Sequence, residues 1–366
     1  MIEFGGVIQK VKKLKKTKEI KLGVTGCILD SDKKNLEKKV DFIFNINDLK
    51  QLPKLIDNKI ELDIDDYFCI KPKFFNNYVA YIPIMTGCNN FCSYCVVPHT
   101  RGRERSRDPE EIIQEAKLAI KQGFKEIWLI GQNVNSYKNE KYTFASLLKE
   151  IDNIPGEYWL NFTSSHPKDF NLEVISVMKE SKHITPLLHL PVQSGSDKVL
   201  KDMNRPYTID KYVDIVNKAK KEIKDLCIST DIIVGFCGET KEEYLKTKSL
   251  IKDIAFDIIY LAVYSPRKNT YAFDNLKNDV SLFEKKRRWH DLNKTLKEIN
   301  LENNKKYLNK EYQVIVFEKK GSTCLGKTSF GKIIKFKSDK VQEGCFCNVV
   351  VKKTLSLILE GGFVSW

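Results

Sequence analysis

The sequence predicts an α/β protein built on a partial barrel of six βα units, with a small α/β segment before it and a small all-β barrel after it. Two observations predict the central part. Six short apolar runs alternate with helical patterns from about residue 80 to 265, and polar or glycine-rich residues follow each run. A third observation predicts the end of the chain, where strand-like alternation replaces the helical patterns from residue 311. Strands separated by helices form parallel βαβ units.

The six apolar runs are the expected strands, at residues 81–85, 126–130, 158–162, 187–190, 227–234 and 257–264. The clearest helix between them starts after Asp108, a typical N-cap residue, with Pro109 at the first helical position. Gly123 fits the C-terminal cap of this helix. Further helical patterns cover 144–152, 171–180, 209–224 and 240–253, and a long lysine-rich helix covers 281–307.

The two flanking parts have different patterns. Residues 1–75 predict part of another α/β unit, with an amphipathic lysine-rich helix, a strand, a helix and a second strand; the first helix covers 7–19 and the strands 21–25 and 41–45. Near the C-terminus, strands are expected at 314–316, 333–336, 348–351 and 355–359, which predicts a small barrel of the kind that often binds nucleic acid. We therefore expect three domains, at 1–75, 76–307 and 308–366.

Charge and cysteine content narrow the class of protein. Sixty-two Lys and Arg against 48 Asp and Glu give a net charge of +14, which favours a polyanionic partner such as nucleic acid; a solvated lysine-rich surface is the alternative. The lysine-rich N-terminus lacks the apolar h-region of a signal peptide, and no apolar run reaches about 20 residues, so we expect a cytoplasmic protein without membrane segments, and a monomer. Ten cysteines in such a protein indicate metal or catalytic use for some of them.

The residues that follow the six strands predict where the active site lies. They are segments 87–88, 131–133, 164–167, 191–194, 235–239 and 265–267, and all are polar or rich in glycine. Parallel strands of a barrel end at one rim, and barrel enzymes carry their active sites there. We therefore expect these six segments to surround the active site.

Three cysteines follow the first strand at a spacing typical of a metal centre. Cys88, Cys92 and Cys95 place three thiolates on one short loop. Three thiolates suit a 4Fe-4S cluster with one iron free of protein ligands, and that iron can chelate the amino and carboxylate groups of S-adenosylmethionine (SAM). One electron from the cluster then cleaves the sulfonium bond and yields a 5′-deoxyadenosyl radical. The alternative is a structural zinc site with His99 as the fourth ligand, although such a site has no need to lie at the barrel rim.

With these residues, the chain resembles the radical SAM methylthiotransferases. The resemblance runs from about residue 20 to the end, and the all-β tail is similar to the family's TRAM domain, an RNA-binding module. The matching segments are 87–98 (GCNNFCSYCVVP), 101–107 (RGRERSR), 131–137 (GQNVNSY), 165–169 (SHPKD), 189–197 (HLPVQSGSD), 203–205 (MNR) and 229–236 (STDIIVGF). The resemblance implies the radical SAM fold for the partial barrel of six βα units.

The resemblance also implies a reaction on tRNA. Segment 131–137 is similar to the branch that methylthiolates isopentenyl-adenosine beside the anticodon (the MiaB type), whereas the branch acting on threonylcarbamoyl-adenosine differs after the second strand. The implied reaction converts adenine carbon 2 from C–H to C–SCH₃. One SAM is the methyl donor, and a second SAM is cleaved to the radical. The implied partners are the tRNA anticodon stem-loop, SAM and an electron donor such as flavodoxin or ferredoxin.

Further site residues are expected from their places at the strand ends. Gln132 and Asn133 are placed to meet the SAM amino group, and Gln193, Ser194 and Asp231 to hydrogen-bond its ribose or carboxylate. Each has a turn or cap role as the alternative.

Other residues near the cysteine loop are expected to contact cofactor or substrate. Tyr94 would pack against the SAM adenine or the cluster, and His166 is either a substrate-side group or a satisfied loop histidine. Four arginines alternate on a segment that we expect to be exposed beside the cluster, where phosphate contact is expected: Arg101, Arg103, Arg105 and Arg107.

Some positions depart from the family pattern. The family has a second 4Fe-4S cluster held by three cysteines of the N-terminal domain; Cys27 matches the third, and the other two belong upstream, where this chain has no cysteine. We therefore expect the chain to begin after them, to hold one cluster and to cleave SAM without completing methylthiolation. A non-catalytic RNA-binding remnant is the second hypothesis. In addition, Cys237 replaces the usual proline, and Lys327 replaces an arginine of the β-module, which keeps the positive charge for phosphate but not the bidentate fork.

Overall fold

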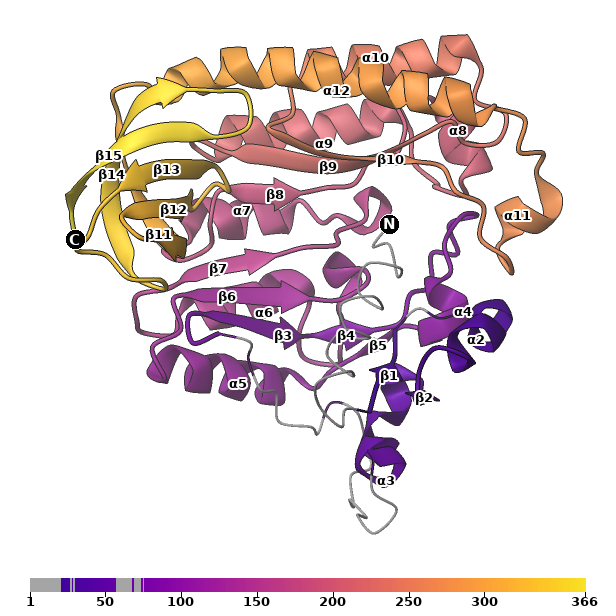
Figure 1. Cartoon of the computed structure of the whole chain (residues 1–366), viewed down its shortest axis with the longest axis horizontal. Coiled ribbons are helices and arrows are strands. Elements are labelled where there is room, and N and C mark those ends of the chain that lie inside the picture. Colours follow the sequence, from indigo (N-terminus) through magenta and orange to yellow (C-terminus); the bar gives the residue numbers. More distant parts are fainter. Residues whose placement is uncertain (1–20, 27, 29, 57–67, 69–73, 75) are drawn as a thin grey trace.

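The computed structural model describes residues 21–26, 28, 30–56, 68, 74 and 76–366 (Figure 1). Six parallel strands form its centre, in two sheets of three. One sheet contains β3 (Val79–Pro83), β6 (Glu126–Ile130) and β7 (Trp159–Phe162), and the other contains β8 (Leu187–His189), β9 (Cys227–Val234) and β10 (Ile258–Val263). A bridge between Leu160 and Ile184 joins the sheets in the order β3-β6-β7-β8-β9-β10. The predicted fold class is confirmed.

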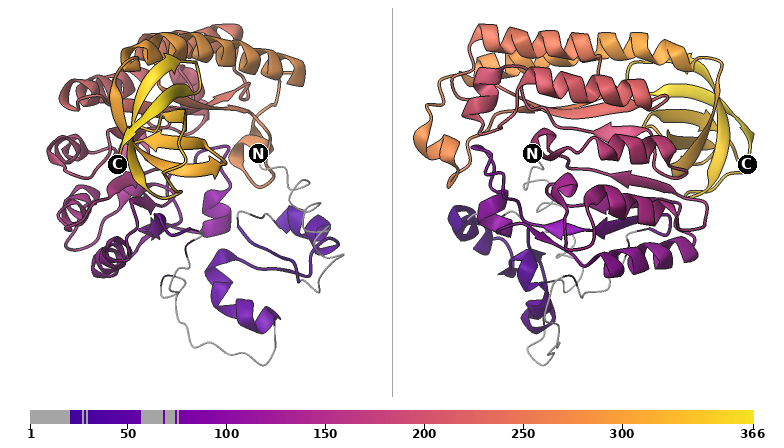
Figure 2. Two further views of the ribbon diagram at one scale, coloured as in Figure 1. Left: turned by 60° about the vertical axis from the view of Figure 1, so that its left-hand side comes forward. Right: turned by 180° about the vertical axis from the view of Figure 1, so that it is seen from behind.

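Helices cover the outer side of the strands (Figure 2). They are α5 (Pro109–Lys121), α6 (Phe144–Asp152), α7 (Glu173–Glu180), α9 (Ile209–Glu222) and α10 (Lys241–Ile254). Because side chains alternate along a strand, every second residue packs against this helical layer, as with Ala80 and Ile82 of β3, which are fully buried. Tyr81 between them faces the inside of the barrel and is 52% exposed.

Helix α5 begins and ends at the residues that predict its two caps. The Asp108 side chain accepts a hydrogen bond from the Glu111 backbone N–H at 3.1 Å, and Pro109 begins α5. At the other end Gly123 has φ +89°, the left-handed conformation that a helix C-terminus favours. The strands β6 and β9 have the predicted bounds, and the other four lie within three residues of theirs.

Several short elements at the carboxyl-end rim were not predicted. They are β4 (Met85–Thr86), β5 (Arg105–Ser106), α4 (Val97–Arg101), η3 (Val134–Ser136), η4 (Pro167–Asp169), α8 (Asp197–Asp202) and α11 (Tyr271–Asn275). Their lengths of two to six residues are too short for a periodic pattern to develop.

The C-terminal part is a closed five-stranded barrel in the order β11-β12-β13-β15-β14, with β11 also pairing with β14. Its strands are β11 (Glu311–Lys320), β12 (Thr323–Thr328), β13 (Ile333–Lys337), β14 (Phe346–Thr354) and β15 (Leu359–Ser365). The predicted strand at 355–359 is wrong: the Leu355 N–H bonds to the Ile358 carbonyl in a tight turn, and β15 begins at Leu359. Closure pairs the strand edges and isolates the apolar interior from water.

This barrel closes the amino-terminal ends of the six strands (Figure 1). α12 (Leu282–Asn304), followed by η5 (Lys305–Tyr307), connects the two parts. The Trp159 and Phe346 rings pack 4.8 Å apart, and Lys327 Nζ donates to both carboxylate oxygens of Glu126 at 2.6 and 2.8 Å. The expectation that Lys327 serves phosphate binding is therefore wrong, because its ammonium is paired inside the interface between the two barrels.

The N-terminal part contains two parallel strands, β1 (Gly23–Val24) and β2 (Phe42–Ile43), which lie within the two predicted strands. The remaining elements there are α2 (Asp30–Glu37), η1 (Ile46–Gln51) and α3 (Leu52–Ile56). The predicted helix at 7–19 and the candidate ligand Cys27 lie outside the described residues. None of the helices in the described part of the chain has the length and apolar character needed to span a bilayer.

Candidate active site

A short hairpin holds the two ends of the cysteine loop together. β4 and β5 pair through Met85 with Ser106 and Thr86 with Arg105, so residues 87–104 leave and return at one place on the rim. Gly87 has φ +77°, and a Cβ there would lie 2.0 Å from the Arg103 carbonyl oxygen. Only glycine fits this position.

The loop is also fixed to the opposite side of the rim. Ser93 donates its backbone N–H to the Met203 carbonyl at 3.0 Å and its hydroxyl to the Asp202 carbonyl at 2.7 Å. The Ala272 N–H of α11 donates to the Ser93 carbonyl at 2.7 Å. The end of α8 and the start of α11 therefore hold the middle of the loop, between its second and third cysteines.

The chemistry of the loop fits an iron–sulfur cluster. Cys88, Cys92 and Cys95 form no disulfide with another described cysteine and are half-buried, and burial raises the pKa of the Cys88 thiol. Within the described residues no three His, Cys, Asp or Glu side chains gather closely enough to share one metal ion. In a 4Fe-4S cluster each thiolate binds a different iron, so the ligands stand farther apart than those of one zinc ion. His99 lines the same cavity of about 510 Å³ as Cys92 and Cys95.

A buried arginine lies against the second cysteine. Arg205 Nη1 donates to Cys92 Sγ at 3.5 Å and to the Tyr94 hydroxyl at 3.4 Å. Its Nη2 donates to the Pro191 carbonyl at 2.8 Å, and its Nε donates to the Tyr207 hydroxyl at 2.6 Å. Arg205 is 5% exposed. The Tyr94 hydroxyl thus shares a donor with Cys92 and its ring lies 6.3 Å from the Phe236 ring, while its expected contact with SAM or the cluster stays a prediction.

His166 also lies at the cysteine loop. Its Nε2 is 4.0 Å from Cys92 Sγ, and its Nδ1 accepts the Lys168 N–H at 3.2 Å. Asn135 fixes the backbone on both sides, accepting the His166 N–H at 2.8 Å and donating to its carbonyl at 2.9 Å. Burial, followed by the charges of Arg205 and Lys168, lowers the pKa of His166 to about 2. The imidazole is therefore neutral at physiological pH.

The residues after β6 and β7 present buried hydrogen-bond acceptors at the rim. Among the described residues, Gln132 Oε1, Asn133 Oδ1 and Ser165 Oγ are buried without a hydrogen-bond partner. Asn133 Nδ2 donates to Asp169 Oδ2 at 2.8 Å. Buried acceptors without partners are costly unless a ligand supplies a donor. Their placement is consistent with the expected contacts of Gln132 and Asn133 to the SAM amino group, which remain a prediction.

Gln193 and Asp231 lie side by side, whereas Ser194 faces elsewhere. The Gln193 N–H donates to the Asp231 carbonyl at 2.8 Å, and Asp231 Oδ2 lies 3.7 Å from His189 Nε2 on the inner barrel wall. The Ser194 hydroxyl accepts the Ser196 N–H at 3.2 Å and lies 3.4 Å from Thr247 Oγ1 of α10. These contacts give Ser194 the turn role, which was the alternative to a contact with SAM.

The four arginines of segment 101–107 differ in their surroundings. Arg107 Nη1 lies 2.5 Å from a Glu115 carboxylate oxygen, and its side chain is 10% exposed. The expectation that Arg107 contacts phosphate is therefore wrong, because its guanidinium is paired with Glu115. Arg103 lies over the Phe91 ring at 4.6 Å and Arg105 over the Phe68 ring at 4.8 Å. Arg101 Nε is buried without a hydrogen-bond partner among the described residues.

The comparisons with known proteins identify the family. Residues 82–251 match the model of the radical SAM superfamily. A tRNA-2-methylthio-N(6)-dimethylallyladenosine synthase of Clostridium botulinum (strain Langeland, type F) is 39% identical, covering 97% of this chain and 83% of that protein. The protein of the same name from Fervidobacterium nodosum is 40% identical, over 94% and 83%. The chain belongs to the MiaB-type radical SAM tRNA methylthiotransferases.

Membership in this family confirms the predicted enzyme class, and it implies a 4Fe-4S cluster, SAM and tRNA. Among solved structures, coproporphyrinogen III oxidase from Escherichia coli, described as a radical SAM enzyme, aligns with 76% of the chain at 13% identity and a TM-score of 0.49. The sequence singles out the three-cysteine loop, but it does not indicate the position of Arg205 beside Cys92. The motif Met203-Asn204-Arg205 was noted, yet nothing local shows that its guanidinium is buried against Cys92.

Proposed function

We propose that this chain methylthiolates carbon 2 of isopentenyl-adenosine beside the anticodon of tRNA. The observation that carries the proposal is the loop of three cysteines at the carboxyl-end rim, in a chain whose relatives are named for this product. When bound, the cluster and SAM would supply the radical that activates carbon 2. The protein's own part is to hold these groups and to orient the adenine over them.

The binding roles are assigned by position at the rim. Cys88, Cys92 and Cys95 would hold the cluster. Gln132 and Asn133 would accept hydrogen bonds from the SAM amino group through oxygens that lack partners within the described residues. On the opposite wall, Gln193 and Asp231 would contact the SAM ribose or carboxylate.

The proposal includes partners and location. Each SAM cleavage consumes one electron, which a flavodoxin or ferredoxin would supply. The net charge of +14 suits the anticodon stem-loop as a polyanionic substrate. We also propose that the protein is a monomer located in the cytoplasm, where tRNA is present.

The number of clusters stays a prediction. A second cluster would need Cys27, which lies outside the described residues, and two further cysteines. Anaerobic reconstitution followed by iron analysis measures it: about four irons per chain would support one cluster, and about eight would support two. A count of about eight irons would support the complete methylthiolation proposed above, whereas about four would support the expectation from the sequence, SAM cleavage without methylthiolation.

The activity test uses reconstituted protein with SAM, dithionite and tRNA. The first readout is 5′-deoxyadenosine, and the second is the methylthio nucleoside from tRNA carrying isopentenyl-adenosine or, in parallel, threonylcarbamoyl-adenosine. Cys92→Ser should lose iron and 5′-deoxyadenosine, whereas Cys237→Ser, a buried cysteine of the same rim, should keep both. A colourless wild-type protein containing zinc would overturn the proposal, and modification of the second tRNA would reassign the substrate.

A further inference from the structure

Arg205 is a buried cation without an acidic partner. It is 5% exposed, and no carboxylate of the described residues forms an ion pair with it. Its guanidinium donates to two tyrosine hydroxyls, one backbone carbonyl and one thiol. Burying a charge without an opposite charge costs several kcal/mol. The functional state of the protein should therefore supply a negative charge at this place.

The sulfur of Cys92 marks where that charge lies. Arg205 Nη1 is 3.5 Å from Cys92 Sγ. The other group beside this sulfur is His166, whose Nε2 lies 4.0 Å from Cys92 Sγ. A cluster bound through three thiolates carries net negative charge, and reduction adds one more electron. The guanidinium thus faces Cys92, a proposed ligand through which it can act on the cluster.

The geometry also fixes the guanidinium tightly. The Tyr207 hydroxyl accepts from Arg205 Nε at 2.6 Å and donates to the Val192 carbonyl at 2.8 Å. The Pro191 carbonyl accepts from Nη2 at 2.8 Å. Pro191 and Val192 directly follow β8, so the segment that leads to the proposed SAM contact Gln193 also orients the arginine.

We propose that Arg205 is the counter-ion of the cluster, positioning Cys92 and raising the reduction potential of the cluster by stabilising its reduced form. Hydrogen bonds to the sulfurs and local charge are the levers by which a protein sets such potentials. In the one-electron reduction the cluster gains the electron that the donor loses, and the fixed positive charge offsets the added negative charge. The proposal rests on the proposed function only in requiring a cluster on this loop.

The experiment is a redox titration of the reconstituted protein without SAM or tRNA, followed by the electron paramagnetic resonance signal of the reduced cluster. Arg205→Met removes the charge and keeps most of the volume. We expect its midpoint potential to fall by about 59 mV or more, a tenfold change in the oxidised-to-reduced ratio of a one-electron couple. Arg205→Lys keeps the charge and should fall less, with an altered signal because the fork geometry is lost.

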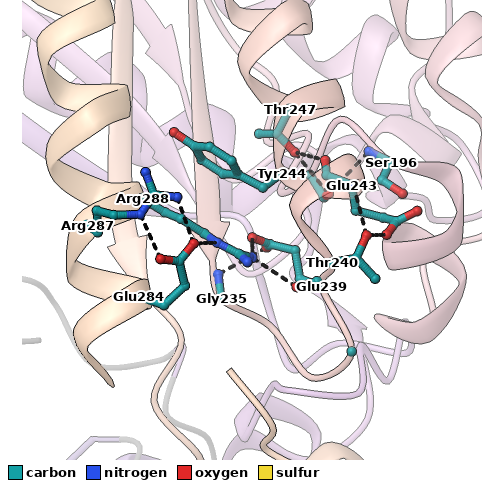
Figure 3. A network of polar contacts seen from close by, with 12 residues as sticks. Ser196, Gly235, Glu239, Thr240, Glu243, Tyr244, Thr247, Glu284, Arg287 and Arg288 are labelled. Atoms are coloured by element: carbon teal, nitrogen blue, oxygen red, sulfur yellow. Dashed lines mark hydrogen bonds and ion pairs between the residues drawn. The ribbon is translucent and has the colours of Figure 1, made fainter. Parts of the chain in front are cut away.

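Arg288 of α12 offers a matched control. It is also 5% exposed, but its Nη1 lies 2.5 Å from Glu239 Oε1 and its Nε 2.8 Å from Glu284 Oε1 (Figure 3). Arg288→Met removes a buried guanidinium that already has carboxylate partners. We expect it to destabilise the fold and to leave the cluster potential unchanged.

The outcomes separate this proposal from the proposed function. A folded Arg205→Met protein that holds a cluster with the wild-type potential and signal would overturn it, as would an equal shift in Arg288→Met. A folded variant that fails to load iron would support the positioning role. If Arg205→Met does not fold, Tyr207→Phe, which removes the hydroxyl bound to Nε, should shift the potential in the same direction, and no shift would overturn the proposal. Wild-type protein without iron would instead defeat the proposed function.

Discussion

Removing the ammonium of Lys327 tests how the C-terminal barrel is attached to the partial barrel. Lys327 Nζ donates to both oxygens of Glu126, whose side chain is 2% exposed. In Lys327→Met the carboxylate keeps the hydrogen bond from Asn161 Nδ2 at 3.2 Å but loses both bonds to the ammonium. Removing one partner of a buried ion pair costs about 3–5 kcal/mol. Because the Lys327 side chain is 28% exposed, water can reach the site, and we expect the lower value, about 3 kcal/mol.

Thermal unfolding of the cluster-free protein measures this loss. For a chain of this length, about 3 kcal/mol lowers Tm by about 4 °C. Lys337→Met on the neighbouring strand β13 is the control, since Lys337 is exposed and should change stability by less than about 0.5 kcal/mol. Adding Glu126→Gln to Lys327→Met removes the unpaired carboxylate charge. The double variant should regain more than half of the free energy of unfolding that Lys327→Met loses. A Lys327→Met protein as stable as the control would refute the reasoning, and so would a double variant as unstable as the single one.

Three further predictions concern the loop, a helix cap and a buried thiol. Gly87→Ala places a Cβ 2.0 Å from the Arg103 carbonyl at φ +77°, so we expect about 1–3 kcal/mol of strain and several-fold less iron after reconstitution; wild-type iron content would contradict this. Asp108→Ala should lower stability in urea unfolding by about 1 kcal/mol, and Asp108→Asn, which keeps an acceptor, by less. Burial raises the pKa of Cys347 to about 12 from its usual 9.0, so its stabilising contribution is present below pH 9 and is lost as pH rises above it. Iodoacetamide at pH 8 should accordingly alkylate half-buried Cys345 before Cys347, and equal rates would argue against this burial.

Much of the barrel could be predicted from the sequence because its signals are local. Apolar runs of four to eight residues gave the six strands, and Asp108 with Pro109 marked the start of α5. The prediction of a strand at 355–359 is wrong because it too relied on a local signal alone. Leu355 begins an apolar stretch that resembles a strand, but its N–H closes a turn with Ile358, and the paired strand starts one residue later.

The sequence by itself determined the order of strands and helices and the three-thiol loop, because strand alternation, helix caps and ligand spacing are written within a few neighbouring residues. Only the tertiary structure decided which charged side chains are buried. Arg205 meets Cys92 across 113 residues and Lys327 meets Glu126 across 201, while Arg107 turns inward beside Glu115. A charge is buried or solvated according to the element packed over it, and that packing joins segments whose separation along the chain carries no local pattern.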